Sequence, residues 1–283
     1  MGKPIFEDCT IGHYSFEGVI KINERLINLS QAINVRDLGG YITSNGKHTK
    51  WNKLIRAGEM ADLSSDDKNI LLNYGVNCVI DLRSDAEILK SPDALPSEIE
   101  YVQIPLFNDD ETESSEVINQ MNRLYSRDPH SGHIRMMEVY RKLAIGKQPQ
   151  GAYQKFFQLL LNSGERQNIL FHCSAGKDRT GIIAALILGA LGVDEWITKQ
   201  DYLLTNKLIF SRVQRRIEYA IAANMNAQFI TSLFSLSTVS LDYFDAAFAI
   251  INYTFGGVQQ YLKDWVGLTA DDITKLQQIY LEF

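Results

Sequence analysis

The chain has 283 residues, of which 45% are hydrophobic and 22% charged, with a formal net charge of -6 and a pI of about 5.4. This length allows one large domain or two small ones, with a substantial core. A mildly acidic chain is not built to bind nucleic acid through its overall field, so we expect no nucleic-acid partner and look for anion binding in local clusters of donors.

The first predicted elements are a hairpin and a capped helix. Residues 41–51, YITSNGKHTKW, predict a β-hairpin whose Asn45-Gly46 pair adopts positive φ in a type I′ turn. Residues 63–75, LSSDDKNILLNYG, predict a helix with Ser64 or Ser65 as N-cap, acidic residues in its first turn and Gly75 at its end.

Two short strands and an acidic segment follow. Residues 76–82, VNCVIDL, are β-rich and short and predict a buried strand, and residues 101–106, YVQIPL, predict a second strand. Residues 109–116, DDETESSE, predict a solvated loop or, in the alternative, a mobile lid beside a site.

The second half is mainly helical. Helical patterns cover about 116–126, 133–145 and 151–162, and the apolar run NILFH at 168–172 predicts another strand. From Thr180 onward the chain predicts helix almost throughout, and its last helix begins with Thr269 as N-cap and acids in the first turn.

Cysteine and histidine usage predicts neither disulfides nor a metal or other cofactor. Cys9, Cys78 and Cys173 are few, far apart and without a Cys-x-x-Cys pair. His130 and His133 are three residues apart, but their segment is polar, contains Pro and Gly, and has no cysteine nearby.

The N-terminus and the apolar runs bear on location. The first residues, MGKPIFEDCTIGHYSFEG, lack the apolar region and cleavage site of a signal peptide. The longest apolar run, Gly181 to Val193, is shorter than the roughly 20 residues that span a bilayer. We expect no transmembrane segment and a cytoplasmic protein, or a secreted one if a leader has been removed.

Short apolar strands that alternate with helices predict an α/β fold, with a mostly parallel central sheet flanked by helices and a helical C-terminal part. No repeat, low-complexity tract or linker divides the chain, so we expect one domain over residues 1–283. Ligands bind at the carboxyl ends of strands in such sheets, and the strand at 168–172 leads directly into Cys173.

The segment HCSAGKDRTG, residues 172–181, joins this strand to a helix. Backbone N–H groups in such a loop form an anion nest, and the helix dipole adds positive potential. Gly176 permits the turn, while Ser174 and Ala175 leave room for a ligand. We expect Thr180 or Ser174 to donate a further hydrogen bond.

The same field stabilises a thiolate at Cys173, whose pKa we expect to lie below the ordinary ~8.5 of a free thiol. Arg179 offers a planar fork that matches two phosphate oxygens. A buried inert cysteine would leave the cluster of Lys177, Asp178 and Arg179 unexplained. The nucleotide-binding pattern GxxxxGK[ST] fails, because Asp178 follows Gly176-Lys177 and Phe171 stands where the first glycine belongs.

HCSAGKDRTG resembles the bacterial and fungal tyrosine/lipid phosphatase family, cysteine-dependent enzymes whose loop reads HCxxGKDRTG. The stretches NVRDLGGY, LIRAGEMADLS, VIDLRSDAE, DYLLTN and YTFGGVQQYLKDWVGLTADDI resemble the same family. The likeness runs from about residue 30 to the C-terminus, with a weak middle at 107–150. It implies one α/β phosphatase domain.

The resemblance assigns roles to the loop. Cys173 matches the nucleophile that forms a phosphocysteine, and Arg179 matches the phosphate clamp. Lys177 and Asp178 match the residues that set this family apart, and Ser174, Ala175, Gly176 and Thr180 complete the phosphate-binding loop. Since the chain has no Trp-Pro-Asp loop, Asp178 is the first choice of general acid. Asp81, Asp109 and Asp110 are the alternatives.

Segments outside the loop carry further expectations. Arg36 and Asp37, in RDLGG, are expected to orient the loop or touch substrate, or else to form a salt-bridged turn. For Arg83 a functional and a structural role are likewise both open. Lid elements are expected within 107–150 and 208–240, where the helix RVQRRIEYAIAANM either packs in the core or covers the site.

The expected substrates are phosphotyrosine proteins and phosphoinositide lipids. Lys177 stands where the tumour-suppressor phosphoinositide phosphatase also has a lysine, and a cation there suits a neighbouring phosphate. Inositol phosphates and other small soluble phosphates are the alternative within the class. Non-catalytic phosphate binding is a second alternative, and sulfurtransferases or arsenate reductases are a third that lacks the Lys-Asp-Arg-Thr-Gly run. The sequence leaves the oligomeric state open.

Overall fold

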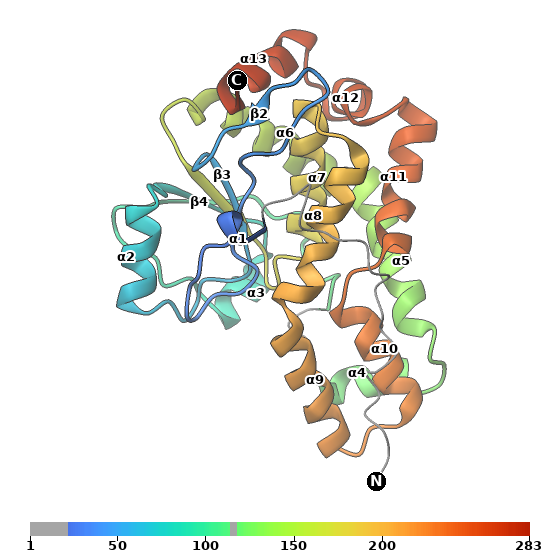
Figure 1. The fold of residues 1–283 in the computed structure, drawn as a ribbon. Helices are drawn as coiled ribbons and strands as arrows, with labels where there is room; N and C mark the ends of the chain where they lie inside the picture. The colour runs from blue at the N-terminus through green and yellow to red at the C-terminus, as the bar shows by residue number, and fades with distance from the viewer. Residues whose placement is uncertain (1–21, 114–117) are drawn as a thin grey trace.

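The computed structural model describes residues 22–113 and 118–283, in which helices surround a small sheet (Figure 1). Cys9 lies outside the described residues. The strands are β1 (Arg36–Asp37), β2 (His48–Thr49), β3 (Leu54–Ala57), β4 (Cys78–Asp81), β5 (Glu100–Gln103), β6 (Ile169–His172) and β7 (Leu281–Glu282). The helices are α1 (Ile22–Arg25), α2 (Ser65–Asn73), α3 (Asp85–Lys90), α4 (Ile118–Tyr125), α5 (Ser131–Ile145), α6 (Lys147–Ser163), α7 (Arg179–Leu191), α8 (Glu195–Leu208), α9 (Phe210–Ala222), α10 (Ala227–Ser237), α11 (Leu241–Phe255), α12 (Val258–Tyr261) and α13 (Ala270–Tyr280), with one π-helical segment, η2 (Leu262–Val266), between the last two.

The central sheet has five strands in the order β1-β3-β6-β4-β5. Strands β3, β6, β4 and β5 are parallel, and only β1 runs antiparallel, at the edge beside β3. The predicted α/β fold with a mostly parallel sheet is therefore confirmed. Because β6 is the middle strand, the loop that follows it lies at the centre of the sheet's carboxyl edge.

Alternate side chains of the buried strands face two separate cores. Ile169 and Phe171 of β6 belong to the larger core, which contains most of the helices. Leu170 belongs to a smaller core together with Leu71 of α2. In Figure 1, α2 lies on one side of the sheet, while α5 to α8 and α11 form a thick layer on the other. Both faces are covered, which explains why the strands read as continuous apolar runs.

The N-caps that the sequence predicted for two helices are confirmed. Ser64 caps α2 and Thr269 caps α13, each in a reciprocal capping box. A third capping box, Ser84 with Glu87, opens α3, a helix that the sequence analysis does not predict. Its six residues are too few to show a helical period.

The predicted hairpin is present, since Ile42 and His48 form an antiparallel bridge, but its predicted type I′ turn is wrong. Gly46 has a φ of +81°, but Asn45 is not among the residues with positive φ. The Asn45 side-chain oxygen accepts hydrogen bonds from the Thr43 hydroxyl and the Lys47 backbone N–H. This side-chain anchoring lets Gly46 alone take the left-handed conformation. Strand β2 then pairs with the C-terminal β7 in a second, two-stranded sheet.

The helical part beyond β6 wraps around α7 and extends past the sheet. In Figure 1, α9, α10 and α4 project together at the end of the molecule to which the strands' carboxyl edge points. Within the described residues no single helix is both long and apolar enough to span a bilayer; α10 and α11 reach that length and composition only as a pair, bent by 51°.

Candidate active site

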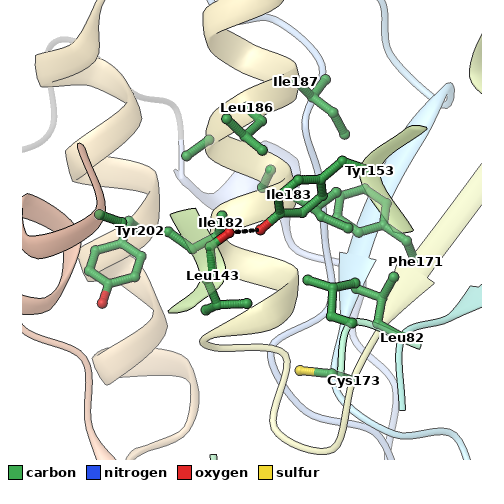
Figure 2. Close-up of a cluster of buried hydrophobic side chains, with 14 of the residues drawn as sticks. Leu82, Leu143, Tyr153, Phe171, Cys173, Ile182, Ile183, Leu186, Ile187 and Tyr202 are labelled. Carbon is green, nitrogen blue, oxygen red and sulfur yellow. Dashed lines mark hydrogen bonds between the residues drawn. The ribbon is translucent and has the colours of Figure 1, made fainter. Parts of the chain in front are cut away.

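The loop of residues 173–178 connects β6 to α7 and is buried along its whole length. Cys173 is 2% exposed and belongs to the same core cluster as Ile182 and Ile183 of α7. Figure 2 shows its sulfur at the edge of that apolar cluster, below Leu82 and Phe171. The apolar helix thus fixes the loop in the core, as the sequence predicts.

Several donors of the loop have no partner among the described residues. The backbone N–H groups of residues 174–178 donate to no acceptor there. The Arg179 Nε and the Thr180 hydroxyl are buried and without a hydrogen bond in this part of the chain. Buried donors in native proteins nearly always have an acceptor. Around one sulfur, such a set is a cradle for an anion with several oxygens.

The opposite side of the loop is fastened to β1 and β3. The Gly176 carbonyl oxygen accepts hydrogen bonds from Asn34 Nδ2 at 2.7 Å and from Arg56 Nη2 at 2.8 Å. Gly176 has a φ of +65°, and a Cβ there would lie 2.4 Å from the Ala57 carbonyl oxygen. Both the backbone conformation and the close approach require glycine.

Behind these contacts lies a buried ion cluster centred on Asp201 of α8. The Asp201 carboxylate contacts Arg36 Nε at 2.8 Å and Arg56 Nη1 at 2.6 Å, and Tyr41 donates its hydroxyl at 3.0 Å. Burial alone would raise the pKa of Asp201, but the two arginines hold it well below its ordinary value. Arg36 also donates to the Asn34 carbonyl oxygen. Arg36 therefore supports the loop through its neighbours and does not reach the cradle.

Asp37, predicted with Arg36, is not brought to the loop. Its carboxylate accepts from the backbone N–H groups of Gly39 and Asn52 and from the Tyr74 hydroxyl, each at 2.6 Å. It therefore belongs to a structural turn, but one built on hydrogen bonds and not on the salt bridge expected as the alternative.

Glu87 is the residue of the site that sequence reasoning missed. Its carboxylate forms a bidentate pair with Arg179, accepting from Nη1 at 2.6 Å and from Nη2 at 2.7 Å. It also accepts the Ser174 hydroxyl at 2.5 Å. Burial alone would raise the pKa of Glu87, but the hydrogen bonds from Arg179 lower it. The Ser84-x-x-Glu87 capping box after β4 is the signal that could have located it.

Asp178 is fully engaged within the site. Its Oδ1 accepts the Tyr140 hydroxyl at 2.8 Å, and its Oδ2 lies 2.6 Å from the Lys177 ammonium. Both Lys177 and Asp178 are 1% exposed. The expected rim cation is therefore a buried one, paired with the residue beside it.

The alternative acids occupy different surroundings. Asp110 lies 3.7 Å from Arg179 Nη2 and accepts the Thr112 hydroxyl at 2.8 Å, so the described part of the acidic segment, residues 109–113, reaches the site. Asp81 is fully buried and bound to Arg83 at 2.7 Å. Asp109 is exposed.

A second charged cluster surrounds His172, the residue before Cys173. Its Nε2 lies 2.8 Å from Asp93, and Asp81 is 3.9 Å away. Burial alone would lower the pKa of His172, but these two carboxylates raise it. The ligand atoms of Asp81, Asp93 and His172 lie within 4.8 Å of one another, a spacing that suits a metal ion. However, Arg83 donates to both carboxylates, so the cluster already holds a cation. His133, one of the two spaced histidines, pairs with Asp242 instead.

Helix α9 covers the loop. Arg212 donates to the Ser174 carbonyl oxygen at 3.2 Å, and Arg216 donates to the Glu113 carbonyl oxygen at 2.9 Å. A small cavity separates α9 from the loop, and its lining comprises Ala175, Lys177, Ile209, Arg212, Val213, Arg216 and Ser237.

The contribution of the Asp201 cluster to folding stability can be tested by its dependence on pH. Because the pKa of Asp201 is lowered on folding, its contribution to stability is present above the unfolded pKa and is lost as pH falls through the folded pKa. We expect Asp201→Asn to cost about 3–5 kcal/mol at pH 7, since it leaves two buried arginines without a counter-charge. In urea unfolding, the difference in unfolding free energy between the unmodified protein and Asp201→Asn should become smaller below about pH 4. Asp271→Asn, at an exposed carboxylate, should stay within about 0.5 kcal/mol; equal losses for both variants would contradict the account.

Gly176 and Gly46 form a matched pair for testing the cradle. Both have positive φ, at +65° and +81°, but a Cβ at Gly46 has nothing within 4 Å. We expect Gly46→Ala to cost about 1 kcal/mol of stability from backbone strain alone. Gly176→Ala should cost more and weaken the binding of tungstate, a tetrahedral oxyanion, at least tenfold by calorimetry. Unchanged tungstate affinity in Gly176→Ala would argue against an anion cradle here.

Two named phosphatases and one solved structure are similar to this chain. A putative tyrosine-protein phosphatase of Cupriavidus necator is 31% identical over 252 residues, which cover 88% of this chain and 85% of that protein. The triple specificity protein phosphatase PtpB of Mycobacterium tuberculosis is 26% identical over 279 residues, or 89% of this chain and 98% of that one. The crystal structure of Pseudomonas aeruginosa TpbA overlaps with a TM-score of 0.27 and 16% identity, over 56% of this chain and 71% of that one.

A family model described as the tyrosine phosphatase family matches residues 27–282, which include both sheets and the loop between β6 and α7. The chain belongs to the tyrosine phosphatase family.

Proposed function

We propose that this protein hydrolyses phosphate monoesters through a phosphocysteine at Cys173. The observation that carries the proposal is the set of buried, unpartnered donors around the sulfur: the N–H groups of residues 174–178, Arg179 Nε and the Thr180 hydroxyl. A tetrahedral dianion bound there presents its phosphorus to the Cys173 sulfur. Membership of the tyrosine phosphatase family supports this chemistry.

The proposed reaction has two steps. In the first, the Cys173 thiolate attacks phosphorus, an S–P bond forms, the P–O bond to the leaving group breaks, and Asp178 gives its proton to the departing oxygen. In the second, water attacks phosphorus, its proton passes to Asp178, and the S–P bond breaks to return the thiolate and release phosphate. Arg179 stabilises the charge on the transferring group in both steps.

Access to the sulfur requires a change in the cover. Cys173 is 2% exposed, with α9 fastened to the loop by Arg212 and the acidic segment placed beside Arg179 by Asp110. We propose that these two segments are the lid elements expected within 208–240 and 107–150 and that they separate when substrate binds.

We propose phosphotyrosine and phosphoinositides as the substrates. A phosphoinositide carries a second phosphate, and the cavity between α9 and the loop is lined by Lys177, Arg212 and Arg216. The description of the relative PtpB as a triple specificity phosphatase supports a broad range. Inositol phosphates share the same chemistry and are the alternative, as is phosphate binding without turnover.

The mechanism is tested by phosphate release from an aryl phosphate, a phosphotyrosine peptide, a phosphoserine peptide and short-chain phosphoinositides. We expect Cys173→Ser to reduce turnover to background and Arg179→Lys to lower kcat by about a hundredfold, since lysine lacks the planar fork. Turnover that survives in Cys173→Ser, or its absence in the unmodified protein, would falsify the covalent mechanism.

The phosphoinositide assignment is tested by two arginines of α9. Arg212 lines the cavity beside the loop, whereas Arg215 is exposed on the same helix. We expect Arg212→Ala to lower kcat/KM for a phosphoinositide about tenfold relative to an aryl phosphate, because a charge-assisted hydrogen bond is lost. Arg215→Ala should leave that ratio within about twofold. Equal ratios in both variants would favour phosphotyrosine alone.

A further inference from the structure

A chain of hydroxyl groups ends on Asp178. The Tyr202 hydroxyl of α8 lies 2.7 Å from the Tyr140 hydroxyl of α5, and the Tyr140 hydroxyl lies 2.8 Å from Asp178 Oδ1. Tyr140 is fully buried, and Tyr202 and Asp178 are each 1% exposed. Side chains of α8 and α5 therefore form a hydrogen-bonded chain that ends on one carboxylate.

The hydrogen bonds run in one direction, from Tyr202 through Tyr140 to Asp178. Each tyrosine hydroxyl has one proton. The Tyr202 hydroxyl donates to the Tyr140 oxygen, and the Tyr140 hydroxyl donates to Asp178 Oδ1. Asp178 Oδ1 is thus a fixed acceptor. A proton carried by this carboxyl group must sit on Oδ2, the oxygen that faces Lys177.

Core tyrosines of this protein donate their hydroxyls either to backbone carbonyl oxygens or, as Tyr41 does to Asp201, to carboxylates. Tyr153 donates to the Leu143 carbonyl oxygen, as Figure 2 shows, and Tyr261 donates to that of Ala144. Tyr140 instead reaches a carboxylate in the loop. Asp178 is also the N-cap residue of α7 but makes no side-chain capping hydrogen bond. Its carboxylate is therefore held by the tyrosine chain and Lys177 and not by the helix.

We propose that Tyr140 and Tyr202 are positioning residues that present Asp178 with Oδ2 as its working oxygen. The inference deepens the proposed function, in which Asp178 gives and takes the proton. In the structure the Lys177 ammonium lies 2.6 Å from Oδ2. A bound phosphate dianion draws this ammonium away, after which Oδ2 can carry the proton. The tyrosine chain keeps Oδ1 in place while Lys177 changes partner.

Leaving-group dependence tests the proposal. Tyr140→Phe removes the hydrogen bond and little volume, so the acid loses its orientation. We expect kcat for phenyl phosphate, whose leaving group needs a proton, to fall about tenfold, a part of the 10²–10⁴-fold that a general acid supplies. For an aryl phosphate with a strongly acidic phenol, kcat should change by less than twofold, and KM should stay unchanged for both. Tyr202→Phe should act in the same direction more weakly, because Tyr140 remains.

Tyr153→Phe is the matched control, since it removes a buried hydroxyl that donates to a backbone carbonyl. We expect it to affect both substrates alike, with a loss of thermal stability similar to that of Tyr140→Phe. Equal effects of Tyr140→Phe on the two leaving groups, or none on either, would overturn the inference while leaving Cys173-dependent turnover intact. Absence of Cys173-dependent turnover in the unmodified protein would overturn the proposed function and this inference together.

Discussion

The arrangement of the loop depends on where the Gly176 carbonyl points. Arg56 and Asn34 hold that oxygen toward β1 and β3. With the carbonyl turned outward, the neighbouring N–H groups remain for an anion on the other side. Arg56 can occupy this position only because Asp201 neutralises it in the core, where a lone guanidinium would be costly. A carboxylate on α8, 25 residues from the loop in sequence, thereby sets the polarity of the cradle.

Glu87 performs a similar task for Arg179. By binding both Nη atoms it fixes the guanidinium in one orientation and leaves the buried Nε without a hydrogen-bond partner among the described residues. The arginine therefore needs no reorganisation when an oxyanion arrives, which is the condition under which a charged donor contributes most to a transition state. The same carboxylate holds Ser174, so helix α3 positions both ends of the loop. Preorganisation here comes from contacts that do not touch the anion.

The sequence predicted most local features and missed the distant contacts; the local exceptions are the turn at Asn45-Gly46 and helix α3. The loop, its preceding strand, its following helix and the caps at Ser64 and Thr269 each follow from adjacent residues, and all are confirmed. Glu87 and Asp201 lie far from the loop in the chain, and each reads as an ordinary acid of an amphipathic helix. Their roles arise only when β4, β6 and α8 come together. Lys177 was misplaced for a related reason, because its burial depends on α9, whose position over the loop no local pattern fixes.

Almost every cation near the loop is paired with a carboxylate, so the phosphate binding that we propose for this acidic protein depends on the remaining donors. Arg179 pairs with Glu87, Lys177 with Asp178, and both Arg36 and Arg56 with Asp201. The donors left over are mainly uncharged N–H groups, which attract an anion only at hydrogen-bonding distance. The site therefore selects by geometry and not by long-range attraction. Of these pairs, Lys177 with Asp178 is the one that an arriving phosphate must separate under the mechanism we propose. In that proposal the charge of the substrate itself frees the acid.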